Sequence, residues 1–181
     1  MNIFVEGEYV ESVLYIAQRN AERGRKTALV AGSVELLPFD FETLDRKKID
    51  FKGVDVYISQ RNFDEKDYNM VIYYNCEDKA AVKPNHNDIC LWIIQQGAVA
   101  GTDPFVHYCC RKKMVVRNYT EHPMFDAVLS RYEEYEIYCI PYTQEDHVEN
   151  INLQMLGTWD YSNLSDKYKE FLSDFFQRNR G

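Results

Sequence analysis

The sequence lacks the short motifs that identify the common catalytic classes. It contains no Walker loop, no G-x-S-x-G, no H-E-x-x-H and no C-x-x-C. The longest apolar runs are far shorter than the roughly 20 residues of a membrane-spanning helix. No basic and then apolar start with a small-residue cleavage site indicates a signal peptide. We therefore expect a cytoplasmic protein that makes no membrane contact.

Positive charge is also scarce. The 21 Lys and Arg residues stand against 29 Asp and Glu residues, a net charge of −8 over 181 residues. General nucleic-acid binding needs a cationic surface, so the composition argues against nucleic acid as a partner. The best candidate for a local basic patch is formed by Arg111, Lys112, Lys113 and Arg117.

The cysteines show no pattern of a disulfide framework. Their number is odd, and most of them lie in apolar runs. This usage predicts reduced core residues in a cytosol-like compartment. The five positions are Cys76, Cys90, Cys109, Cys110 and Cys139.

Strand-like and helix-like segments alternate along the chain. Short apolar runs predict strands at 2–5, 27–31, 54–59, 69–75, 89–94, 113–118 and 136–142. Helices are predicted at 8–23, after Asp103, at 120–132, after Thr143 and at 164–178. The alternation indicates a single α/β domain over residues 1–181. We expect a Rossmann-like three-layer sandwich with a mostly parallel sheet, whose ligands bind at the carboxyl ends of the strands.

The predicted helices carry apolar stripes and capping residues. On helix 8–23, Glu11 lies off the apolar stripe and is expected to face solvent. Thr120 is expected to cap helix 120–132, and Met124 is expected on the side of that helix that faces the core. Thr143 and Asp146 form a pair that resembles a capping box, before a helix that bears Val148, Ile151 and Met155.

The first strand-to-helix turn reads "VEGEYVES" and has the spacing of the dinucleotide fingerprint G-x-G-x-x-G. Its three glycine positions hold Glu6, Glu8 and Glu11. These side chains add bulk and negative charge where a pyrophosphate would lie, so they argue against NAD or FAD here. Two interpretations remain open. The glutamates either favour the start of the helix through its dipole, or Glu6 belongs to a metal site.

The metal interpretation rests on a resemblance. "IFVEG", followed by "ALVAGS" after the second strand, resembles the first motif of Toprim domains, which hold magnesium with that glutamate and a later acidic pair. The nearest counterpart of the pair is Asn75-Cys76-Glu77. The resemblance implies a Mg²⁺ site at Glu6 and Glu77 and phosphoryl-transfer chemistry.

A second resemblance covers residues 88–156. The order of strand, glycine loop, "DP" helix, "KMVV" strand and later helices is similar to the donor-binding half of GT-B glycosyltransferases. It implies a nucleotide or nucleotide sugar at Gly101 and Thr102, with Arg117 beside its phosphates and Asp103 as the nearby acid. One half of such an enzyme implies a partner chain or a homo-oligomer.

Among the histidines, His122 precedes Pro123 at a predicted strand-to-helix turn on the ligand-facing edge of the sheet, which makes it the first candidate for acid–base catalysis.

The sequence as a whole leads to three functional hypotheses. The leading one is a nucleotide or nucleotide-sugar binding protein, including a glycosyltransferase-like enzyme. The others are a non-catalytic α/β interaction protein and a Toprim-like metal enzyme.

Overall fold

The computed structural model describes residues 1–33, 37, 48–58, 63–76, 83–98 and 102–177. The strands are β1 (Asn2–Gly7), β2 (Thr27–Ala31), β3 (Ile49–Phe51), β4 (Val54–Ile58), β5 (Met70–Tyr74), β6 (Ile89–Gln95), β7 (Arg111–Arg117) and β8 (Tyr135–Ile140). The α-helices are α1 (Val10–Glu22), α2 (Pro123–Leu129), α3 (Gln144–Leu156) and α4 (Asp166–Gln177).

The strands form one sheet in the order β3-β4-β2-β5-β1-β6-β7-β8. All neighbouring strands are parallel except β3, which runs antiparallel to β4. After β1 the chain moves to one side of the sheet, and after β5 it crosses to the other side. The strand order therefore switches at β1, between β5 and β6, where ligands of such sheets bind at the carboxyl ends.

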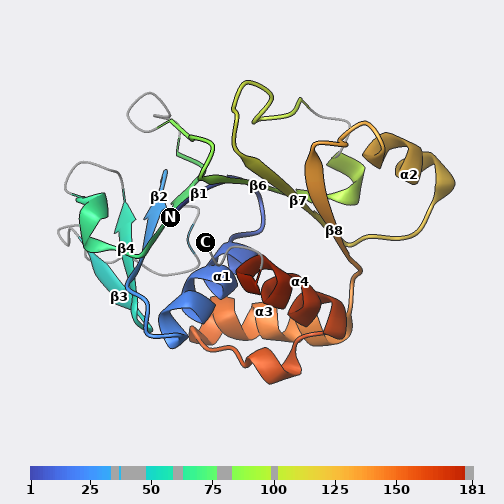
Figure 1. The fold of residues 1–181 in the computed structure, drawn as a ribbon. Helices are drawn as coiled ribbons and strands as arrows, with labels where there is room; N and C mark the ends of the chain where they lie inside the picture. The colour runs from blue at the N-terminus through green and yellow to red at the C-terminus, as the bar shows by residue number, and fades with distance from the viewer. Residues whose placement is uncertain (34–36, 38–47, 59–62, 77–82, 99–101, 178–181) are drawn as a thin grey trace.

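Helices lie on both faces of the sheet, which confirms the predicted α/β three-layer sandwich (Figure 1). Alternate strand residues such as Ile3, Val5 and Leu91 pack in one core cluster with α1 and α4. The residues between them, such as Phe4 and Trp92, form a second cluster on the opposite face, with α2 and loop residues.

Helix α1 is buried almost all round because the sheet, α3 and α4 all pack against it (Figure 1). Its polar residues are therefore inside as well. Ser12 shares a hydrogen bond of 2.5 Å with Tyr168, and Asn20 donates to Thr27 at 2.8 Å. Glu11 is only 5% exposed, so its predicted place outside the buried side was wrong.

Residues 102–110 form turns, and the helix predicted after Asp103 is absent. The Asp103 carboxylate accepts a hydrogen bond from the amide of Phe105, two residues along, and another from the Tyr135 hydroxyl. A helix cap would bind an amide at the start of a continuing helix, whereas here the buried Phe105 ring fixes a turn against the sheet.

Helix α2 is shorter than predicted, and His122 caps it in place of Thr120. Met124 is exposed on α2, contrary to prediction.

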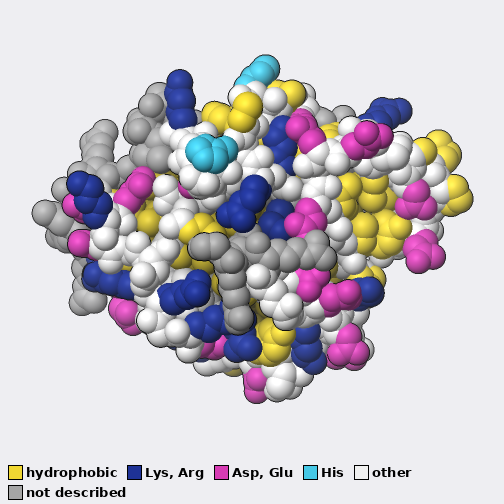
Figure 2. Space-filling view, in the orientation of Figure 1, with side chains coloured by type: hydrophobic (Ala, Val, Ile, Leu, Met, Phe, Trp, Pro, Cys, Tyr) yellow, Lys and Arg dark blue, Asp and Glu magenta, His cyan; other side chains and the backbone are white. Residues whose placement is uncertain are grey.

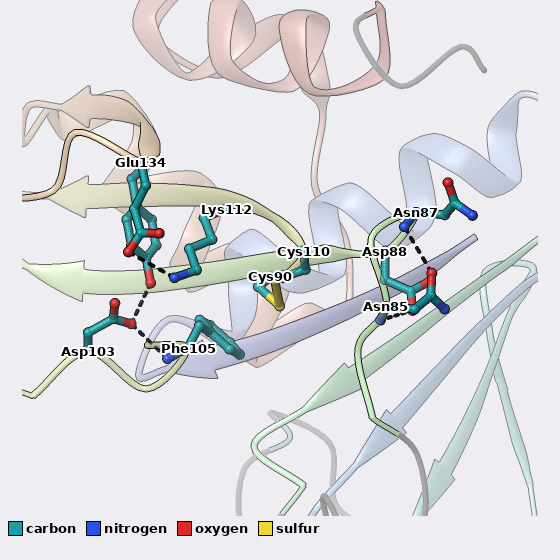
Figure 3. Close-up of a disulfide and its surroundings, with 10 residues drawn as sticks. Asn85, Asn87, Asp88, Cys90, Asp103, Phe105, Cys110, Lys112 and Glu134 are labelled. Atoms are coloured by element: carbon teal, nitrogen blue, oxygen red, sulfur yellow. Dashed lines mark hydrogen bonds and ion pairs between the residues drawn. A yellow bond between two sulfur atoms is a disulfide. The ribbon is translucent and has the colours of Figure 1, made fainter. Parts of the chain in front are cut away.

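Two cysteines that the sequence predicts as reduced form a disulfide. Cys90, buried on β6, is joined to Cys110, which ends the turns over the same face of the sheet (Figure 3). Their Cα atoms lie 6.2 Å apart, within the usual range for a disulfide. The fold brings the two residues together from 20 positions apart, which the residue spacing did not reveal.

Candidate functional site

The carboxyl edge of the sheet at β1 is closed by close backbone packing. A Cβ atom on Gly7 would lie 1.9 Å from the Ile93 carbonyl oxygen, and one on Gly32 would lie 2.0 Å from that of Asn75. Gly7 also has φ = 147°, a conformation that residues with a side chain rarely adopt. The two glycines are therefore required for the approach of neighbouring strand ends.

Asn75 forms hydrogen bonds with the backbone polar groups of this turn. Its side chain accepts a hydrogen bond from the Gly7 amide at 3.0 Å and donates one to the Gly7 carbonyl at 2.7 Å. The Tyr74 hydroxyl also donates to that carbonyl. Only two residues separate β1 from α1. The Gly7 amide, which would face a phosphate in a glycine-rich turn, is thus used internally.

Arg117 and Glu11 are two buried charges beside this turn. Arg117 is 4% exposed, and its Nε and Nη1 atoms have no hydrogen-bond partner in the described part of the chain. The guanidinium lies 4.4 Å from the ring centre of Tyr168 and 5.4 Å from that of Tyr9. Burial raises the pKa of the Glu11 carboxyl above its ordinary value, and Arg117 offsets only part of that rise.

The residues predicted to bind a nucleotide sugar lie on two faces of the sheet. Arg117 packs on the α1 and α4 side, against Tyr168. Asp103 bonds to Tyr135, which belongs to the core cluster of the opposite face. Thr102 is exposed next to Asp103, and Gly101 lies outside the described residues. The structure therefore does not bring Arg117 together with Thr102 and Asp103.

The predicted metal site is described only in part. Glu6 is the last residue but one of β1, half-buried and in register with Trp92 of β6. Glu77 lies outside the described residues. Within the described ranges, no group of three or more His, Cys, Asp and Glu side chains is placed to hold a metal ion. The Mg²⁺ site stays a prediction.

The exposed His122 accepts a hydrogen bond from the Met124 amide through Nδ1 at 3.3 Å, so it acts as the N-cap of α2.

The basic patch predicted at Arg111, Lys112, Lys113 and Arg117 is not formed on the surface, because three of its four members are buried. Lys112 pairs with Glu134 at 2.9 Å, and Lys113 pairs with Glu136 at 2.5 Å (Figure 3 shows the first pair). Only Arg111 stays exposed, beside Asn87.

Helix α3 has the reverse of the usual amphipathic arrangement. Four of its apolar residues face outward, with Met155 78% and Leu156 69% exposed, followed by Val148 at 45% and Ile151 at 39%, and only Leu153 among its large apolar side chains is buried. We call these four residues the outer face of α3. Three residues of the helix are buried, and two of them, Asp146 and Glu149, are acidic. The apolar stripe identified in the sequence is therefore present but exposed, which periodicity alone could not show.

Hydrogen bonds satisfy the buried acidic side of α3. Asp146 accepts from the Ser165 amide at 2.8 Å and from the Ser165 hydroxyl at 2.7 Å. Glu149 accepts from the Asp160 amide at 2.8 Å and from the Asn163 side chain at 2.9 Å. Turning the apolar stripe inward would break all four bonds, so the helix is fixed in its present orientation.

Comparisons with known proteins support the fold. No family model matches the chain, and no curated protein matches it. Among solved structures, a plasmid partition protein from Borrelia burgdorferi is similar, with a TM-score of 0.56 and 11% sequence identity over 98% of each chain. At this identity the similarity shows the α/β architecture alone.

None of the described helices has the length and apolar character needed to cross a bilayer.

Proposed function

We propose that this chain is a non-catalytic α/β protein that acts by binding another protein through the outer face of α3. The observation that carries the proposal is the exposure of Val148, Ile151, Met155 and Leu156 on one helix whose inner side is fixed by buried carboxylates. Contiguous exposed apolar side chains on a folded protein commonly mark an interaction surface.

The carboxyl edge at β1 supports the same conclusion. A catalytic or nucleotide site there would need free backbone amides or a cationic lining. Instead, the Asn75 side chain is hydrogen-bonded to both the amide and the carbonyl of Gly7. The same strand-to-helix segment carries Glu6, Glu8 and Glu11. Negative charge at this place opposes the binding of phosphate groups.

The structural neighbour is named for plasmid partition. A role of that kind, carried over as a hypothesis, would involve this chain through a protein contact and not through direct contact with DNA. The net charge is −8, and Lys112, Lys113 and Arg117 of the predicted basic patch are buried. Lys and Arg side chains do reach the surface, but Asp and Glu side chains lie on the same face (Figure 2), and the overall negative charge opposes binding to the phosphates of nucleic acid.

Arg117 motivates a second candidate function. A buried guanidinium with two nitrogens that lack a partner suits an anionic group, as the predicted nucleotide or nucleotide-sugar ligand would supply. Glycosyltransferase-like transfer and a Mg²⁺-dependent reaction at Glu6 and Glu77 belong to this alternative. We rank it second because the carboxylate of Glu11 lies close enough to lower the effective charge of the site.

Site-specific photo-crosslinking in the native cells tests the proposed function. A photoreactive amino acid replaces Met155, and in a matched control it replaces Met124, which is 76% exposed on α2. We expect covalent adducts of defined mass at position 155 and none at position 124. Absence of any adduct at position 155, or equal labelling at the two positions, would refute binding through α3.

A thermal-shift screen tests the alternative. Nucleotides and nucleotide sugars are added with and without Mg²⁺ or Mn²⁺, and we expect no change in melting temperature. A nucleotide-sugar shift that is lost in Arg117→Lys and kept in Glu6→Gln would support the second candidate. A shift in melting temperature that requires the metal ion and is lost in Glu6→Gln would support the hypothesis of a Toprim-like metal enzyme.

A further inference from the structure

We infer that the partner bound by the outer face of α3 is a second copy of this chain, with the two α3 helices packed antiparallel about a two-fold axis near Ile151. The inference rests on the proposed function, because it names the occupant of the same surface. It gives an isologous interface, the commonest arrangement of soluble homo-oligomers.

The charge of the surface favours a second copy. The whole chain carries −8, yet Glu145 is the single Asp, Glu, Lys or Arg among the exposed residues of α3. The other exposed residues are Gln144, His147, Val148, Ile151, Gln154, Met155 and Leu156. The cores of protein interfaces are depleted of charge on both sides. An uncharged apolar face is matched by a partner surface that is also uncharged and apolar, and each copy of the chain presents such a surface.

The position of Glu145 selects the antiparallel orientation. In a parallel pair the two Glu145 carboxylates would lie side by side and repel each other. In an antiparallel pair centred near Ile151 they lie at opposite ends, roughly 20 Å apart at 1.5 Å of rise per residue. That separation exceeds the Debye length of about 8 Å at physiological salt, so the repulsion is screened.

The spacing of the apolar residues fits the same geometry. Val148, Ile151 and Met155 follow one another at intervals of three and four residues, the spacing of two helices packed along a common seam. About an axis near Ile151, Val148 of one copy faces Met155 of the other. A short side chain then lies opposite a long one, and Ile151 faces its own copy.

The size of the surface sets the strength of the dimer. Stable interfaces bury about 800 Å² on each partner, more than a single helix of this length provides. We therefore expect a reversible dimer with a micromolar dissociation constant. The association should tighten with salt between about 50 and 500 mM, because salt screens the repulsion between two chains of net charge −8.

Sedimentation equilibrium of the full chain tests this inference. Wild type should show a monomer–dimer equilibrium, and Ile151→Lys should weaken it at least about tenfold, because each dimer then has two lysines at the axis. Met155→Lys should weaken the dimer as well, whereas the matched control Met124→Lys should leave it unchanged. At protein concentrations well below the dissociation constant, where dimerisation adds no stability, each variant should keep the wild-type melting temperature, since all three positions are exposed.

Mixing variants tests the two-fold axis itself. Ile151→Lys and Ile151→Glu should each be monomeric, and an equimolar mixture should form a heterodimer, because residue 151 of one copy faces residue 151 of the other. A monomeric wild type, a dimer that Ile151→Lys does not weaken, or a mixture that stays monomeric would overturn the inference. Photo-crosslinked adducts at position 155 with a different protein, together with a monomeric wild type, would overturn the second copy while supporting the proposed function.

Discussion

Removal of the Cys90–Cys110 disulfide should lower stability by an amount that the length of its loop predicts. The two residues are 20 positions apart. Closing a loop of this length removes chain entropy from the unfolded state worth about 3 kcal/mol at room temperature. For a chain of this size, each kcal/mol changes the melting temperature by about 2–4 °C, so reduction should lower it by roughly 6–12 °C. The substitution Cys110→Ser should have the same effect while sparing the fully buried Cys90.

Calorimetry with and without a thiol reductant measures this difference, with Cys139→Ser as the matched control. Wild type and Cys139→Ser should each lose stability on reduction, and Cys110→Ser should not respond. Thiol titration in denaturant, without reductant, should count three thiols in wild type, those of Cys76, Cys109 and Cys139. Five thiols under these conditions, or a melting temperature independent of reductant, would show that the cross-link does not constrain the chain.

Two further predictions concern the carboxyl edge. Burial raises the pKa of Glu11 above its ordinary value of 4.5, so the folded state binds this proton more tightly than the unfolded state. Wild type should therefore lose stability relative to Glu11→Gln as the pH rises from 4.5 to the raised pKa of the folded state, and the loss should level off above that pKa. Its total is about 1.4 kcal/mol for each unit by which folding raises the pKa. Urea midpoints at acid and neutral pH measure this, and a constant difference between the two proteins would contradict it. Gly7→Ala should destabilise by at least about 3 kcal/mol, because its Cβ would meet the Ile93 carbonyl at 1.9 Å. Urea denaturation with Gly97→Ala as control checks this, since no atom lies within 4 Å of a Cβ there, and equal losses would refute it.

The central strands were predictable because burial on both faces leaves a continuous apolar run in the sequence. The strand β3 gave a weaker signal. It pairs with β4 through a two-residue turn, Lys52-Gly53, in which both residues have positive φ. Asn-Gly or Asp-Gly would have marked such a hairpin, whereas Lys-Gly does so poorly.

The failures of prediction share a cause, which is tertiary contact. Asp103 and Pro104 are good residues for the start of a helix, but Phe105 enters the core and Cys110 is bonded to β6, so the segment between them follows the sheet. On α3, Asp146, Glu149 and Leu153 form one stripe and Val148, Ile151 and Met155 form another. Periodicity shows both stripes. Only the partners Ser165, Asp160 and Asn163 determine which one faces inward.

The candidate site was predictable in place and less so in composition. Glu6 does lie at the carboxyl edge where the strand order switches. The role of Asn75 there had no sequence signal, because an asparagine after a strand is common. Arg117 was singled out from its position at a strand end, but its face of the sheet follows only from the register of β7 with its neighbours.

The position of β1 in the sheet has a consequence for synthesis of the protein. Phe4 pairs with Tyr73 on one side and with Cys90 on the other, so both neighbours of this strand are made long after it. At translation rates of about 5–20 residues per second, β1 waits roughly 4–20 s for its second partner. Until β5 is made, the apolar run from Ile3 to Val5 has neither of its neighbouring strands beside it. The central strand of the sheet therefore waits longest between its own synthesis and its pairing, and the nascent chain depends on α1 or a chaperone to cover it.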